Sequence, residues 1–158
     1  RAMAEIDRGQ LARDNRKISV QMEQLANRYM AQKGLTVGQA HVLRYILLHT
    51  GQGTSLTDIR EEFGCSMATL SCMVKRLREK GYVRAESCAD DDRRKLLFAT
   101  RKGEEVHAYL DEAIGAAQRQ LYGCFSQDEL SALDRLQQKM LRNLSSLMEQ
   151  THKEVSQS

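Results

Sequence analysis

SLTDIREEFGCSMATLSCMVKRLREKGYVRAE, residues 55–86, is the segment of this 158-residue chain that decides its fold. Apolar residues recur at helical spacing on both sides of Gly64, and a short strand pattern follows Gly81. Residues 87–94 are charged, and residues 95–100 form a second strand pattern. Helix, tight turn, helix and basic hairpin predict a winged helix-turn-helix, a fold that binds duplex DNA.

The helix expected between Ser66 and Gly81 has two different faces. At about 100° per residue, four apolar side chains share one arc, and we expect this arc to be buried. They are Leu70, Met73, Val74 and Leu77. The opposite side is small and polar at first and basic further along, as in recognition helices that contact base edges and phosphates. The candidate DNA-binding residues are therefore Ser66, Met67, Ala68, Thr69, Ser71, Cys72, Lys75 and Arg76.

The charged loop of the hairpin carries three aspartates followed by Arg93 and Arg94. Pairing between arginine and carboxylate would fix the shape of this loop. An arginine held at the tip of the hairpin can enter the minor groove of DNA, where negative potential is concentrated. Arg93 and Arg94 are both candidates for this contact.

Charge is distributed unevenly along the chain. Residues 66–102 hold ten Lys/Arg and five Asp/Glu, a local balance of +5 within a chain of net charge +3. A basic block in an otherwise slightly acidic chain is typical of a module that contacts DNA. An ordinary solvated face is the alternative explanation when charge is considered alone.

Long helices are expected on both sides of this module. Their patterns run from about residue 3 to 33, from 101 to 122 and from 127 to about 150, with a polar, frayed tail at 151–158. The expected N-caps of the helices after the first are Thr36, Ser55, Ser66, Thr100 and Ser126. In the helix that Ser55 begins, Leu56, Ile59 and Phe63 are expected to face inward.

The flanking helices are too apolar along one side to stand alone. Ile18 and Met22 belong to such a stripe near the N-terminus, and Leu136, Leu144 and Leu147 belong to another near the C-terminus. The economical solution is a two-fold homodimer in which these helices of both chains pack together. A helical bundle within one chain is the alternative.

Several function classes are disfavoured by the residues. Cys65, Cys72, Cys88 and Cys124 form no Cys-x-x-Cys pair, so no metal or other cofactor is expected. An enzyme is not expected, because the chain has no glycine-rich phosphate loop and no identifiable Cys–His pairing. The absence of a long apolar run and of a signal-peptide pattern predicts a cytoplasmic protein without membrane contact.

The ordered motifs resemble those of MarR-family transcriptional regulators, and the resemblance covers nearly the whole chain. They are LTxxQxxVL at 35–43, TDI at 57–59, SxxTLSxxVKRLxxKGYV at 66–83, an Asp–Arg wing, and SQDEL at 126–130. The resemblance implies a mainly α fold: a winged helix-turn-helix DNA-binding domain at 35–100, with a two-stranded wing, and dimerisation helices at 3–33 and 101–150. It implies a homodimer that binds a pseudo-palindromic operator in double-stranded DNA, usually as a repressor that responds to a small-molecule effector.

The wing departs from the family pattern at one position. Asp92 stands where a basic residue is common, so the resemblance makes Asp91 the wing-stabilising partner of Arg93 and leaves the minor groove to Arg93 or Arg94. The first helix lacks the cysteine of the peroxide-sensing branch. Two alternatives remain: a redox-responsive regulator acting through a cysteine such as Cys72, and a protein-interaction module that has lost DNA binding.

Overall fold

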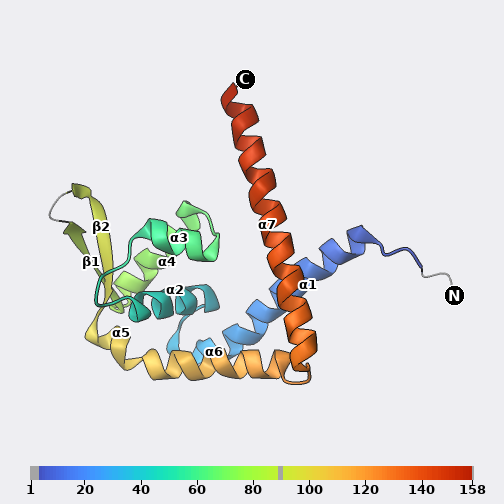
Figure 1. Ribbon diagram of the computed structural model, residues 1–158. Helices are drawn as coiled ribbons and strands as arrows, with labels where there is room; N and C mark the ends of the chain where they lie inside the picture. Colours follow the sequence, from blue (N-terminus) through green and yellow to red (C-terminus); the bar gives the residue numbers. More distant parts are fainter. Residues whose placement is uncertain (1–3, 89–90, 158) are drawn as a thin grey trace. The chain divides into compact units, whose positions relative to one another are not determined.

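The computed structural model describes residues 4–88 and 91–157, apart from the side chains of residues 88 and 91–94. As predicted, the fold is mainly α with a two-stranded wing (Figure 1). In chain order the elements are α1 (Arg8–Met30), the 3-10 helix η1 (Ala31–Lys33), α2 (Val37–Leu48), α3 (Leu56–Phe63), α4 (Met67–Glu79), β1 (Val83–Cys88), β2 (Asp91–Ala99), α5 (Arg101–Glu105), α6 (His107–Tyr122) and α7 (Gln127–Gln157). The chain divides into two units, residues 1–117 and 118–158.

Side-chain caps begin the helices at the predicted residues. Thr36 and Gln39 form a reciprocal capping box at the start of α2, with N···O distances of 3.2 and 3.3 Å. Ser55 begins α3 in the same way, and Thr100 caps α5. At the start of α7, Ser126 and Glu129 exchange hydrogen bonds of 2.9 and 3.1 Å. Each box satisfies backbone N–H groups that have no partner inside the helix.

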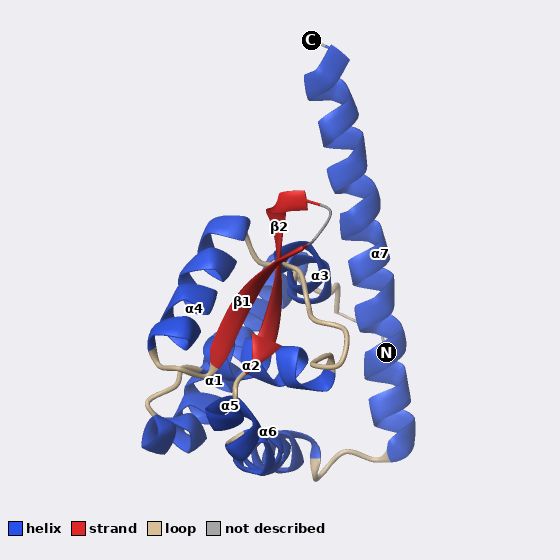
Figure 2. Ribbon diagram, turned by 90° about the vertical axis from the view of Figure 1, so that its left-hand side faces the viewer, coloured by secondary structure: helices blue, strands red, loops and turns tan. Residues whose placement is uncertain are grey.

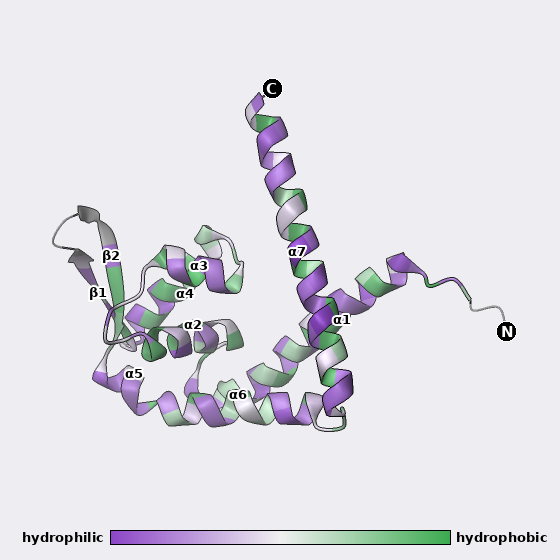
Figure 3. Ribbon diagram, in the orientation of Figure 1, coloured by the Kyte–Doolittle hydropathy of each residue, from purple (hydrophilic) through white to green (hydrophobic). Residues whose placement is uncertain are grey.

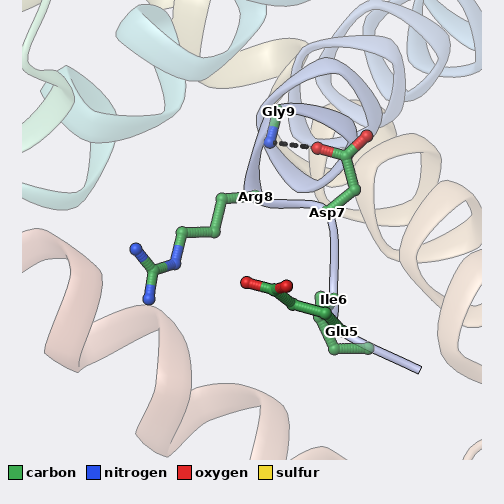
Figure 4. Close-up of a pocket in the computed structure, with 5 residues that line it drawn as sticks. All are labelled: Glu5, Ile6, Asp7, Arg8 and Gly9. Atoms are coloured by element: carbon green, nitrogen blue, oxygen red, sulfur yellow. Dashed lines mark hydrogen bonds between the residues drawn. The ribbon is translucent and has the colours of Figure 1, made fainter. Parts of the chain in front are cut away.

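The start of the first helix and the end of the last helix differ from the predicted positions. α1 begins at Arg8 rather than near residue 3, because Asp7 is its N-cap and accepts a 2.8 Å hydrogen bond from Gly9 N (Figure 4). The predicted frayed tail is helical through Gln157. No glycine or proline interrupts residues 127–157, and Thr151 donates to the Leu147 carbonyl at 3.0 Å within the helix.

The single helix predicted for 101–122 is two helices. α5 ends at Glu105 and α6 begins at His107, with Val106 buried between them. Gly103 lies so close to the residue before β1 that a Cβ atom at position 103 would be 2.4 Å from the carbonyl oxygen of Tyr82. Contacts with the core therefore hold the chain on both sides of the break.

The wing is longer than the sequence indicated. β1 and β2 pair antiparallel from Val83↔Ala99 to Ser87↔Lys95, and the register then shifts before Cys88↔Asp91. Much of the predicted loop at 87–94 is thus strand. Thr54 adds a bridge to the outer side of the sheet through two hydrogen bonds with Leu97, of 2.8 and 3.0 Å. Figure 2 shows the hairpin beside α4.

One hydrophobic core holds the winged helix together. Leu70, Val74 and Leu77 of α4 are buried in it as predicted, while Met73 is half-buried and packs against it. Other fully buried members come from the neighbouring helices: Leu43, Ile46, Ile59 and Leu110. The prediction for Phe63 is wrong, because its side chain is 40% exposed and stands beside the rings of His41 and Tyr45.

α7 has no buried residue within its own unit. Hydrophobic residues recur along the whole helix (Figure 3). Its large exposed hydrophobic residues are Leu136, Met140, Leu141, Leu144, Leu147, Met148 and Val155. Within the described ranges, neither this 31-residue helix nor any other combines the length and apolar character needed to cross a membrane.

Candidate nucleic-acid interface

The first turns of α4 present small side chains to solvent. Ser66 is the N-cap: its Oγ accepts from Thr69 N at 3.2 Å and donates to Thr69 Oγ1 at 2.9 Å. Ala68, Ser71 and Cys72 are exposed, as the helical phase predicted. These side chains are small, so this part of α4 can approach the edges of bases closely.

Met67 differs from the other predicted contact residues. Its side chain is half-buried and packs against the core. Only part of this side chain is therefore exposed for contact with a partner.

A basic hollow lies between α4 and the wing. Its volume is about 190 Å³. Leu56, Val74, Ala85 and Leu97 contribute apolar side chains, and the other lining residues are Ser71, Lys75, Arg78 and Lys95. A second hollow shares Lys75 and Arg78 and extends along β1 to Arg84. An apolar floor with cations around it suits the sugar and phosphate groups of a nucleic-acid strand.

Lys95 is a residue that the sequence interpretation missed. Side chains two positions apart share one face of a strand, so Lys95 lies on the same face of β2 as the buried Leu97. The alternation of residues along β2 could have indicated this face from the sequence. Its position next to α4, however, depends on how the hairpin packs against that helix. Arg78 was predicted only to flank the outward face.

Arg76 of α4 and Arg84 of β1 each have a carboxylate partner. Arg76 Nη1 lies 3.5 Å from Glu79 Oε2. Arg84 pairs with Glu86, and its guanidinium lies 4.7 Å from the centre of the Phe98 ring. Exposed pairs of this kind contribute little to stability, so these arginines can exchange a carboxylate for a phosphate at small cost.

The predicted wing residues Asp91, Arg93 and Arg94 belong to β2 by their backbone, but their side chains lie outside the described residues. Among the side chains that are described, no group of three or more His, Cys, Asp or Glu is placed to hold a metal ion.

The sequence and the fold are similar to those of known proteins. Residues 33–94 match the model of the MarR family. The S. aureus MepR–DNA complex is 25% identical, with a TM-score of 0.79, over 88% of this chain and 99% of that one. The transcriptional regulator SlyA is 23% identical, with a TM-score of 0.78, over 86% and 94%. Mutant MarR from E. coli complexed with operator DNA is 23% identical, with a TM-score of 0.74, over 83% and 93%. Residues 33–94 thus resemble the MarR family, and the fold is that of these winged-helix structures.

Proposed function

We propose that this protein is a sequence-specific transcriptional regulator that binds double-stranded DNA as a homodimer. The observation that carries the proposal is the exposed face of α4, small and polar at its start and continued by the basic hollow beside the wing. This is the distribution of a helix that enters the major groove while flanking cations contact phosphates. The MepR and MarR structures that contain DNA support it.

The residues divide into three roles. Ala68, Thr69, Ser71 and Cys72 are proposed to face the base edges. Lys75, Arg76, Arg78 and Lys95 are proposed to contact phosphates. Arg93 or Arg94, with Asp91 as the wing-stabilising residue, is proposed to contact the minor groove, as the family resemblance implies.

The homodimer is proposed to form through the terminal helices, within 3–33 and 101–150. Ile18 of α1 and Leu144 of α7 are both more than half exposed. Exposed apolar stripes of this length are typical of surfaces that a partner covers. A two-fold dimer presents two winged-helix modules to a pseudo-palindromic operator.

The finer assignment is a ligand-responsive repressor, which rests on the family resemblance. No observation on the described residues favours a redox-responsive regulator or a module that has lost DNA binding, and the cations of the hollow argue against the latter.

Selection from random duplex DNA tests the proposal directly. The full chain is expected to enrich an inverted repeat whose half-sites lie about one helical turn apart. The enriched duplex then serves as the operator in binding measurements. Recovery of unrelated sequences after repeated rounds would contradict sequence-specific binding.

We expect Lys75→Met and Arg78→Met each to weaken operator binding and to reduce the slope of log K against log salt by about one, since each removes one phosphate contact. Titrations over a series of salt concentrations measure this slope. Lys153→Met, which removes an exposed lysine of α7 outside both the hollow and the proposed dimer region, is the charge-matched control and is expected to leave the slope unchanged. A wild-type slope in both hollow variants would remove them from the interface.

Alkylation of Cys72 is expected to weaken DNA binding, because its exposed thiol lies on the face of α4 proposed to enter the groove and the adduct blocks close approach. A gel shift before and after treatment with a thiol-alkylating reagent measures the effect. Cys72→Ser, which keeps Cys65, Cys88 and Cys124, is the control and is expected to bind DNA equally well before and after treatment. Wild-type affinity after mass-verified labelling of Cys72 would show that this side chain does not face the groove.

A further inference from the structure

The C-terminal end of α4 is connected to the start of α2 by one side chain. Lys80 is the C-cap of α4 and is half-buried. Its ammonium donates to the carbonyl of Gly34 and, at 3.3 Å, to Oε1 of Gln39. A charged donor with two oxygen acceptors makes a strong, directional connection.

Both acceptors are themselves held in place. Gln39 is only 8% exposed, and its Oε1 also accepts from Thr36 N in the capping box. Gly34 ends η1 with a φ of 65°, in the left-handed region that favours glycine. The start of α2 is joined to α1 through a 2.7 Å hydrogen bond from Val37 N to Oδ1 of Asn27. Lys80 thus connects α4 to a fixed junction between α1 and α2.

The C-terminal end of α4 also accepts hydrogen bonds from residues at the start of α5. Lys102 Nζ donates to the Lys80 carbonyl at 2.6 Å, and Thr100 Oγ1 donates to the Gly81 carbonyl at 2.5 Å. The cap at the other end of the helix, Ser66 with Thr69, is internal to α4. The position of the N-terminal turns therefore depends on how the C-terminal end and the buried face are held.

We propose that Lys80 is a positioning residue for base recognition: it sets the orientation of α4 from the end opposite the bases. The inference rests on the proposed function. α4 runs from Met67 to Glu79, and at about 1.5 Å per residue this helix is roughly 20 Å long. A small tilt at Lys80 becomes a displacement of Ala68 and Ser71 comparable with the tolerance of a hydrogen bond. Phosphate contacts from flexible lysine and arginine side chains adapt to such a tilt, whereas contacts to base edges do not.

The experiment compares the affinity for the selected operator with the affinity for a scrambled duplex of the same length and base composition. Lys80→Met keeps the aliphatic stem and removes the donors. We expect its ratio of specific to non-specific affinity to fall roughly ten-fold, the scale of one base contact, with an unchanged salt slope. Lys80→Arg restores donors and is expected to recover most of the ratio. Lys75→Met, in contrast to Lys80→Met, is expected to reduce the salt slope.

The ratio is internal to each variant, so a partial loss of folded protein cancels from it. An unchanged ratio in Lys80→Met would overturn the proposal. So would an equal loss of both affinities, which indicates a purely structural role, or a slope reduced by about one, which makes Lys80 a phosphate contact. A wild-type protein that does not discriminate the two duplexes would overturn the proposed function itself, and the two failures are thereby distinguished.

Discussion

Replacing Leu144 and Leu147 of α7 together by glutamate is expected to convert the proposed homodimer into 18.0 kDa monomers. Both side chains are more than half exposed. Covering a leucine contributes about 1.5–3 kcal/mol, and a carboxylate in its place adds the cost of burying a charge without a partner. Sedimentation velocity at micromolar concentration measures the change.

Operator binding is expected to fall with dimerisation by roughly two to four orders of magnitude, because the two modules no longer bind as one linked unit. The double variant Gln138→Glu and Ser146→Glu adds the same charge on the opposite side of α7 and serves as the control. It is expected to remain a dimer that binds DNA. A dimer that survives in the leucine variant would show that this stripe of α7 is not the interface.

Much of the winged helix could be predicted because its signals are local. The caps Thr36, Ser55, Ser66 and Thr100 begin their helices through bonds that reach only three residues along the chain. Helical phase likewise separates the buried Leu70 and Leu77 from the exposed side of α4. Signals of this kind are already present in the order of the residues.

Several other failures arise where distant segments meet. Val106 interrupts a continuous helical pattern while it and Gly103 pack against the core, and no local residue signals that contact. The contribution of Lys95 to the basic hollow requires the pairing of β2 beside α4. Lys80 reaches Gly34 across more than forty positions of sequence, so its place in the helix gives no indication of its partner.

Gly103→Ala is expected to destabilise the winged-helix unit by about 1–3 kcal/mol, the usual cost of overpacking. The new Cβ would lie 2.4 Å from the carbonyl oxygen of Tyr82 and 3.4 Å from the Cβ of Ala99. The oxygen belongs to the backbone and accepts a 3.0 Å hydrogen bond from Thr100 N, so it cannot move without loosening the junction between the wing and α5. Helix propensity alone favours alanine by about 1 kcal/mol. The sign of the change in the free energy of unfolding therefore shows whether overpacking or helix propensity dominates.

Thermal and denaturant unfolding, followed by circular dichroism, measure the free energy of unfolding. Gly51→Ala is the matched control, because a Cβ there meets no atom within 4 Å, and its stability is expected to stay within about 0.5 kcal/mol of wild type. Since Tyr82 follows the C-terminal end of α4 and Thr100 also bonds to Gly81, we expect Gly103→Ala to weaken operator binding as well. A Gly103→Ala protein as stable as wild type would mean that α5 can move away from Tyr82 freely, and that this close contact does not fix the end of α4.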